Sequence, residues 1–161
     1  MIQIQDVQIR PVLPGDLDAL AVLFEEYRLF YGKQPLDRKE LLNFLENLRK
    51  NPEVALQFVL LFNGQAIGFA TLYFTFSSLQ ARRAAVLNDL YINSEHRRSG
   101  LGRVLFQEAR EYCRKNRFAY LQLETAATNL PARKLYDAEG GTPSDFLVYE
   151  FDLDDLKPQK E

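Results

Sequence analysis

The chain has 161 residues, a length that fits one compact domain. Its 20 basic and 22 acidic residues give a net charge of −2, without the basic excess typical of a general nucleic-acid binder. One cysteine and one histidine exclude an intramolecular disulfide and a zinc site built from cysteine and histidine, and we expect no bound metal.

The amino-terminal end has no basic region followed by an apolar block, so no signal peptide is expected. The longest apolar stretches, such as Val54–Phe62, are too short to span a bilayer. We therefore expect one cytoplasmic domain over residues 1–161, without a membrane partner, and a frayed, charged tail over 154–161. Cys113 falls on the apolar side of a predicted helix, which favours core packing over a reactive thiol.

The first third of the chain predicts one strand and two helices. Residues 2–10 have a mixed strand-like pattern that ends at the prolines and glycine of 11–15. Asp16 is the expected N-cap of a helix that continues to about Phe30. Asp37, with a glutamate three residues later, predicts the start of a second helix, which Asn51-Pro52 stops.

A hairpin follows, and the rest of the chain alternates between helices and strands. Asn63-Gly64, a strong turn signal, separates strands predicted over 54–62 and 66–76. The remaining predicted elements are a strand over 84–92, helix 100–115, strand 118–124, helix 131–139 and strand 146–153. The order β-α-α-β-β-β-α-β-α-β predicts a mixed sheet with helices on its faces, a domain of the α/β or α+β class.

The stretch from Leu90-Tyr91-Ile92 through the loop 97–102 has the features of an anion site. A buried strand enters a loop with arginines and glycines, and a helix starts at once. The first amides of a helix lack intrahelical acceptors and carry the positive end of its dipole, and glycine lets a phosphate approach the backbone. We expect a pyrophosphate there. The motifs of nucleoside-triphosphate and dinucleotide loops are both absent.

These residues resemble a known family. Arg97-x-x-Gly100-x-Gly102 is similar to motif A, Arg/Gln-x-x-Gly-x-Gly/Ala, of the GNAT superfamily of N-acetyltransferases. Residues 129–140 are similar to its motif B, Asn-x-x-Ala-x-x-Leu-Tyr-x-x-x-Gly, in the family's order and spacing. Residues 74–78 and 87–91 further resemble the branch with small histone and polyamine acetyltransferases. The resemblance covers about 9–153 and implies a GNAT-like fold with a central, mostly antiparallel mixed sheet.

The resemblance implies acetyl-CoA as co-substrate and a primary amine of a small molecule as acceptor, with direct attack through a tetrahedral intermediate. Two alternatives stay open: a protein lysine or N-terminal acetyltransferase, and a non-catalytic acyl-CoA-binding regulatory module. Because relatives often share terminal strands between subunits, a homodimer is a further expectation. Phe146 and Tyr149 are candidates for its interface or for the site.

The resemblance also implies roles for individual residues. The cofactor-binding residues are Leu90, Tyr91 and Ile92 at the acyl and pantetheine arm, Arg97, Arg98, Ser99, Gly100, Leu101, Gly102 and Arg103 at the pyrophosphate, and Asn129 at the arm. An amide of Tyr91 or Ile92 would stabilise the oxyanion. Tyr136 would protonate the departing thiolate, since a phenol with a pKa of about 10 stays protonated at neutral pH.

The sequence offers several candidates for the general base and for the acceptor-binding residues. Asn88 stands where some polyamine-acetylating relatives have glutamate, which leaves Asp89, Glu124 and Glu26 as candidate bases, or ordered water with no dedicated base. Strict alternation places Asp89 on the opposite strand face from Asn88. The candidate acceptor-binding residues are Glu26, Tyr27, Phe30 and Tyr31, whose rings and carboxylate suit an ammonium ion. Core packing explains Tyr27 and Phe30 equally well.

Overall fold

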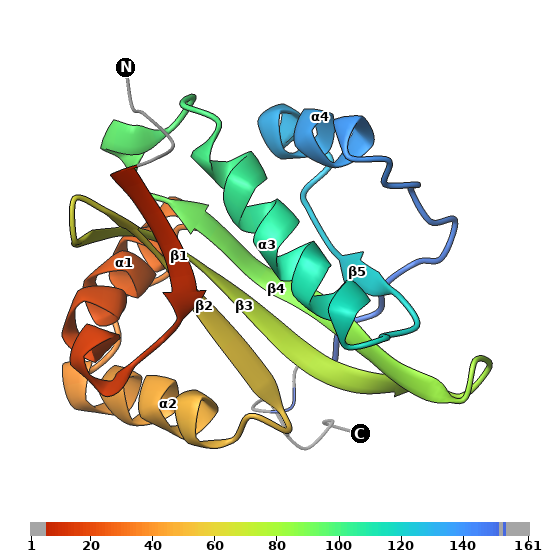
Figure 1. The fold of residues 1–161 in the computed structure, drawn as a ribbon, viewed down its shortest axis with the longest axis horizontal. Helices are drawn as coiled ribbons and strands as arrows, with labels where there is room; N and C mark the ends of the chain where they lie inside the picture. Colours follow the sequence, from red (N-terminus) through yellow and green to blue (C-terminus); the bar gives the residue numbers. More distant parts are fainter. Residues whose placement is uncertain (1–5, 152, 154–161) are drawn as a thin grey trace, which may run out of the picture. The chain divides into compact units, whose positions relative to one another are not determined.

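The computed structural model describes residues 6–151 and 153 (Figure 1). The chain divides into two compact units, Met1–Glu124 and Thr125–Glu161, and each is described by itself. The predicted tail, 154–161, and the first residues of the predicted opening strand lie outside the described residues. Within the described part, no helix is long and apolar enough to cross a membrane.

The larger unit is built on a five-stranded sheet with the order β1-β2-β3-β4-β5. Its elements are β1 (Val7–Pro11), α1 (Leu17–Phe30), α2 (Arg38–Lys50), β2 (Ala55–Phe62), β3 (Gln65–Ser77), β4 (Arg82–Ile92), α3 (Leu101–Lys115) and β5 (Leu121–Leu123). The first four strands pair antiparallel, and β4 and β5 pair parallel. The sheet is therefore mixed and mostly antiparallel, as predicted.

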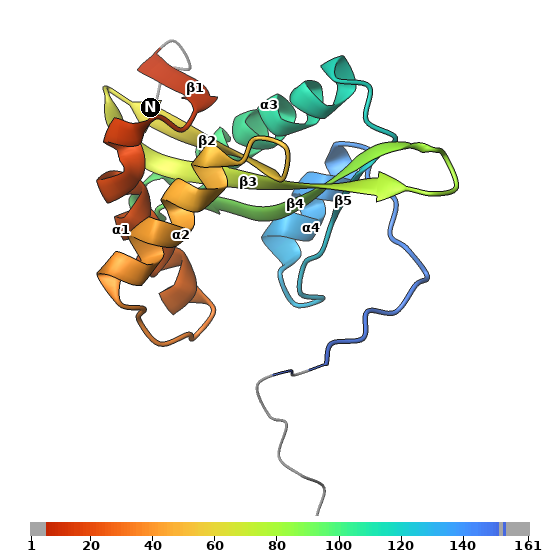
Figure 2. The same cartoon turned by 90° about the horizontal axis from the view of Figure 1, so that it is seen from below.

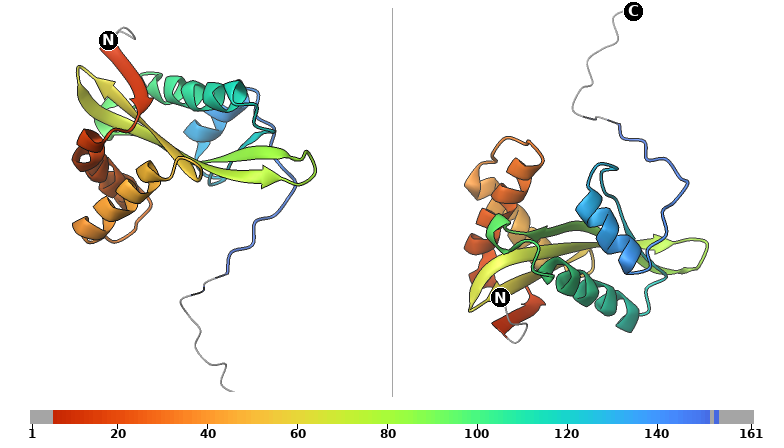
Figure 3. Two further views of the ribbon diagram at one scale, coloured as in Figure 1. Left: turned by 60° about the horizontal axis from the view of Figure 1, so that its bottom comes forward. Right: turned by 90° about the horizontal axis from the view of Figure 1, so that it is seen from above.

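Helices cover both faces of this sheet (Figures 2 and 3). One face, which we call the α1 face, packs against α1 and α2 through Leu20, Phe24, Leu41, Leu45, Val59 and Phe69. The opposite face, the α3 face, meets α3, where Phe58 and Phe74 contact the ring of Tyr112. Cys113 is buried in this layer, and burial raises the pKa of its thiol to about 11. Its predicted packing role is confirmed.

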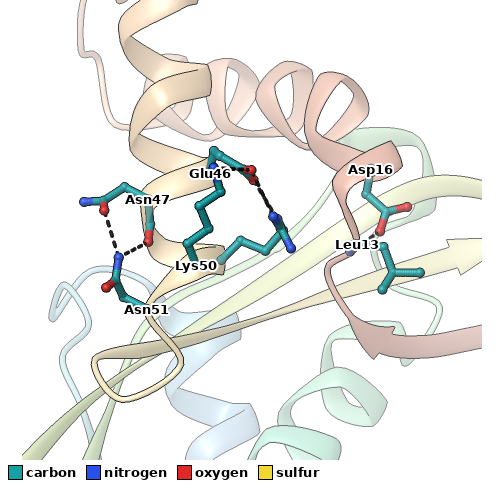
Figure 4. Close-up of polar contacts among 7 residues, drawn as sticks. Leu13, Asp16, Glu46, Asn47, Lys50 and Asn51 are labelled. Atoms are coloured by element: carbon teal, nitrogen blue, oxygen red, sulfur yellow. Dashed lines mark hydrogen bonds and ion pairs between the residues drawn. The ribbon is translucent and has the colours of Figure 1, made fainter.

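The starts of the first two helices are stabilised in different ways. Asp37 caps α2 as predicted, because its carboxylate accepts bonds from the amides of Lys39 (2.9 Å) and Glu40 (3.1 Å). Asp16 is the N-cap residue of α1, as predicted, but its side chain makes no capping hydrogen bond with the helix. Its carboxylate accepts from Arg10 at 2.6 and 2.9 Å. It also accepts from the Leu13 amide at 2.7 Å (Figure 4). The hydrogen bond from Arg10 lowers the pKa of Asp16.

The last turn of α2 is held by contacts between neighbouring side chains (Figure 4). The Asn51 side-chain amide donates to the carbonyl of Asn47 at 2.7 Å and to its side-chain oxygen at 2.8 Å. Glu46 accepts from Arg49 at 2.6 Å and pairs with Lys50 at 3.1 Å. The helix then ends before Pro52, which disfavours helical geometry in the residue before it.

The smaller unit contains α4 (Leu130–Ala138) and an extended carboxyl-terminal segment. Gly140 closes the helix with a φ of +84°, a conformation that glycine adopts without strain. The strand predicted over 146–153 is wrong for the described residues, since 146–151 belong to no strand. Alternating apolar residues make a segment suited to a sheet, but a strand also needs a backbone partner.

Candidate active site

Strand β4 carries a bulge at Asn88. Leu87 pairs with Leu72 and Asp89 with Thr71, so Asn88 is an extra residue. A bulge interrupts strict alternation, and it brings Asn88 and Asp89 onto the same α1 face. The Asn88 side-chain amide accordingly donates to an Asp89 oxygen at 3.0 Å. The prediction that these two side chains point to opposite faces is therefore wrong.

The last part of β4 has an open edge. Its parallel pairing with β5 ends at Leu87, whereas β4 continues to Ile92. Just beyond the strand, the Asn93 amide donates to Ile67 of β3 at 2.9 Å. Because backbone groups alternate along a strand, the amides of Leu90 and Ile92 point to the open edge and that of Tyr91 points to β3. Of the two amides predicted to stabilise the oxyanion, that of Ile92 points to the open edge, whereas that of Tyr91 points to β3.

The loop between β4 and α3 presents helix amides with little obstruction. Arg98 and Gly100 adopt positive φ angles of 62° and 84° and turn the chain directly into α3. The first amides of the helix, those of Leu101 and Gly102, precede any intrahelical acceptor. A Cβ added at Gly102 would meet only Ile92 Cγ1, at 3.9 Å. The first turn of α3, all of which is described, holds no acid, so the start of the helix favours an anion.

Arg97 has a position that the sequence did not predict. Its Nε donates to the Ile92 carbonyl at 2.9 Å. Its guanidinium carbon lies 5.0 Å from the centre of the Phe30 ring and 5.1 Å from that of Tyr91. The side chain thus connects the loop to the end of β4 and to the end of α1.

An aromatic cluster lies on the α1 face beside this loop. Its members are Phe24, Tyr27, Phe30, Tyr31, Phe69 and Tyr91. Tyr27 is central and half-buried, with ring centres of Tyr31, Phe69 and Tyr91 at 5.0, 5.7 and 5.8 Å. Phe30 and Tyr31 are 55% and 49% exposed. The cluster therefore combines core packing, through Phe24 and Phe69, with rings that reach solvent.

Asp89 is the most buried of the candidate acids, with 5% of its surface exposed. Burial raises the pKa of its carboxyl, while hydrogen bonds from Thr71, Tyr27 and Asn88 partly offset that rise. Burial, together with the nearby Asp89 charge, raises the pKa of Tyr73 to about 12 and also raises that of Tyr27.

Two buried polar residues lie beside Asp89 and were not predicted as site residues. Gln57 and Thr71 occupy facing positions on β2 and β3, and Thr71 faces Asp89 on β4, so the three form a row across the sheet. The Gln57 amide nitrogen lies 3.5 Å from Thr71 Oγ1, and Gln57 Oε1 is buried without a hydrogen-bond partner among the residues that the structure describes. The sequence did contain a signal for them, because each is a polar residue at a core-facing position of an otherwise apolar strand.

Glu26 and Glu124 are the other two candidate bases. Glu26 on α1 accepts from the Tyr91 hydroxyl at 3.2 Å. Glu124 is exposed and directly follows β5, where Leu123 pairs in register with Leu87 of the α3 face. Glu124 itself lies outside the strand. Within the described part, no group of three or more His, Cys, Asp or Glu side chains forms a metal site.

The two motif-B candidates lie in the smaller unit. The side-chain oxygen of Asn129 accepts from the Ala132 amide at 3.4 Å, so this residue caps α4. Tyr136 is half-buried near the end of that helix, and its carbonyl accepts from the Gly141 amide at 2.8 Å. The cap is a structural role that the motif did not reveal.

Comparisons with known proteins agree with this arrangement. Residues 19–140 match the model of the acetyltransferase (GNAT) family. The uncharacterized N-acetyltransferase YhfO of Bacillus subtilis (strain 168) is 37% identical over 134 residues, which cover 83% of this chain and 89% of that protein.

Solved structures share the fold. A crystal structure of a probable acetyltransferase has a TM-score of 0.82 and 30% identity, over 91% of this chain and 97% of its own. A possible acetyltransferase from Clostridium difficile 630 has a TM-score of 0.81 and 19% identity over the same shares. The chain therefore belongs to the acetyltransferase (GNAT) family. It is an N-acyltransferase, and members of this family generally use acetyl-CoA.

Proposed function

We propose that this enzyme transfers an acetyl group from acetyl-CoA to a primary amine of a small molecule. The observation that carries the proposal is the meeting of two half-sites at the end of β4. The amino-terminal end of α3, which favours an anion, follows Ile92 along the chain. Tyr91 belongs to the aromatic cluster, and its hydroxyl donates to the Glu26 carboxylate. The first half-site suits a pyrophosphate and the second an amine.

In this proposal the pyrophosphate lies on the amides of Leu101 and Gly102, with Arg98 and Arg103 supplying charge. The pantetheine arm runs along the open edge of β4, where the amides of Leu90 and Ile92 are available for its polar groups and for the acyl carbonyl. Support comes from the end of the β4–β5 pairing at Leu87 and from the open space around Gly102. Asn129 would contact the arm, as the family motif implies.

The reaction is a direct transfer. The nitrogen of a neutral amine attacks the thioester carbon, and the carbonyl becomes an oxyanion that the Ile92 amide stabilises. The carbon–sulfur bond then breaks, the amine nitrogen loses a proton to a base, and the thiolate takes a proton from Tyr136. Holding both reactants in attack geometry supplies much of the remaining rate.

Asp89 is our choice for the base. It is held on the α1 face by three hydrogen-bond donors, and burial moves its pKa upward, towards the range useful for a base. Glu26, which is hydrogen-bonded to Tyr91 on this face, and Glu124 are the alternatives. The contacts of Tyr27 with Asp89 and Tyr31 support an acceptor-binding role for Tyr27 as well as packing.

A thiol-release assay with acetyl-CoA and a panel of amines tests the function. The panel contains a polyamine, an amino-acid amide, an aminoglycoside, a lysine peptide and a peptide with a free N-terminus. Cys113 is buried, so the enzyme contributes little background to a thiol reagent. We expect turnover with a small amine and an acetylated product by mass spectrometry. Turnover confined to the peptides would overturn the proposed acceptor class.

We also propose a homodimer in which the carboxyl-terminal segment is covered by a second copy. Its side chains are largely exposed: Phe146 92%, Leu147 77%, Val148 67%, Tyr149 77% and Phe151 79%. A run of exposed large apolar residues marks an interaction surface. Sedimentation should give a dimer at micromolar concentration that Phe146→Ser with Tyr149→Ser weakens. A wild-type monomer at that concentration would contradict this proposal.

A further inference from the structure

Arg97 connects the two half-sites. It belongs to the cofactor loop, yet its guanidinium group lies over the rings of Phe30, from α1, and Tyr91, from β4. The Nε atom donates a hydrogen bond to the Ile92 carbonyl at 2.9 Å. The Tyr91 hydroxyl in turn donates a hydrogen bond to the Glu26 carboxylate on α1 at 3.2 Å. A continuous set of contacts therefore runs from the loop to the acceptor side.

These contacts have two consequences. A guanidinium over an aromatic face is attracted by the ring, so each contact stabilises the conformation in which the loop lies against α1. The same contacts occupy a face of Phe30 and a face of Tyr91. An acceptor ammonium must therefore share these rings with Arg97 or use others, such as Tyr31, which is 49% exposed.

We propose that Arg97 is a positioning residue that couples the loop 97–102 to the rings of Phe30 and Tyr91 on the acceptor side, in addition to any charge it offers the pyrophosphate. This inference rests on the proposed acetyl-CoA site. Contacts with Phe30 and Tyr91 hold the loop in the conformation that binds the cofactor. The apparent affinity for acetyl-CoA then depends on Phe30, because affinity scales with the fraction of protein in the competent conformation. By linkage, cofactor binding also orders the Phe30 and Tyr91 rings.

A double-mutant cycle separates coupling from direct phosphate binding. The variants are Phe30→Leu, Arg97→Gln and the double variant, with Leu29→Ala as a matched control. Leu29 is the preceding exposed apolar residue on α1. Acetyl-CoA affinity is measured by calorimetry, and hydrogen exchange of residues 97–102 is measured without cofactor. Phe30 is 55% exposed, so we expect its variant to keep the wild-type fold, checked by circular dichroism.

We expect Phe30→Leu to weaken acetyl-CoA binding by about two- to fivefold, the value of one exposed cation–π contact. It should also speed exchange in the loop. Neither effect should add to those of Arg97→Gln, and Leu29→Ala should match the wild type. Unchanged affinity and exchange in Phe30→Leu, or an equal effect in both backgrounds, would overturn the coupling. Exchange without cofactor tests the contact separately, whereas a wild type that binds no acetyl-CoA would defeat the proposed function.

Discussion

Replacing Gly68 by alanine tests the geometry at the end of β4. A Cβ at this position would lie 2.6 Å from Ile92 Cδ1 and 2.7 Å from the Tyr91 carbonyl oxygen. The Ile92 side chain can rotate, but the carbonyl belongs to the backbone of β4. The oxygen is about 0.7 Å inside ordinary contact, which begins at 3.4 Å, so β3 and β4 must separate. The variant therefore moves the residues proposed to hold the acyl group.

The size of the effect follows from overpacking. Forcing extra atoms into a packed site costs about 1–3 kcal/mol. For a chain of this length each kcal/mol lowers Tm by roughly 2–4 °C, so we expect Gly68→Ala to lower it by about 2–12 °C. Gly15→Ala is the control, because its Cβ would have no heavy atom within 4 Å. Thermal unfolding followed by circular dichroism measures both, and calorimetry should show weaker acetyl-CoA binding for Gly68→Ala. Equal Tm values for the two variants would refute the proposed close approach.

Three further predictions concern the loop, the base and the acid. Gly100→Ala should weaken acetyl-CoA binding and cost about 1–3 kcal/mol, because φ is +84° there, whereas Gly15→Ala, whose Cβ would have no heavy atom within 4 Å, should leave affinity and stability unchanged; calorimetry and thermal melts would contradict this if the two variants behaved alike. Asp89→Asn should lower kcat/KM by about 10²-fold and remove its rise with pH through the raised pKa of Asp89. Because a raised pKa means that wild-type stability is lost as pH rises from the ordinary pKa of an aspartate to the raised one, the Tm of Asp89→Asn should improve relative to wild type as pH rises above the ordinary value, and a pH-independent difference would argue against a raised pKa. Tyr136→Phe should bind acetyl-CoA normally and turn over slowly, and full turnover would remove the general-acid role.

The parts of the fold that sequence predicted are those set by local chemistry. Asn63-Gly64 forms the expected turn, with positive φ at both residues. Asp37 caps α2, and the segment after Gly100 forms α3. In each case a few adjacent residues contain the whole cause, so no distant contact was needed for the prediction.

The misses share a dependence on distant partners. Asp16 is the predicted N-cap residue of α1, but its carboxylate does not bond the helix amides, because Arg10 offers it a stronger, charged partner. The bulge at Asn88 is visible only once β4 is aligned with β3, and that alignment decides which side chains meet Asp89. The segment 146–151 has a strand-like pattern but no strand partner among the described residues.

In the candidate site, too, the features set by adjacent residues could be predicted and those set by distant partners could not. The anion-binding start of α3 was readable from Arg97 to Gly102, because amides, glycines and arginines are adjacent in sequence. The position of the Arg97 side chain was not, because the rings that receive it come from α1 and β4. The family motif assigned Arg97 to the pyrophosphate, and only the folded chain revealed its contact with the acceptor side.

Calorimetric titration of the wild-type protein with acetyl-CoA tests the central claim most directly. We expect saturable one-to-one binding that Gly100→Ala weakens and that the control Gly15→Ala leaves intact. Absence of binding by the folded wild-type protein, or equal affinity in Gly100→Ala, would contradict a cofactor site at the start of α3.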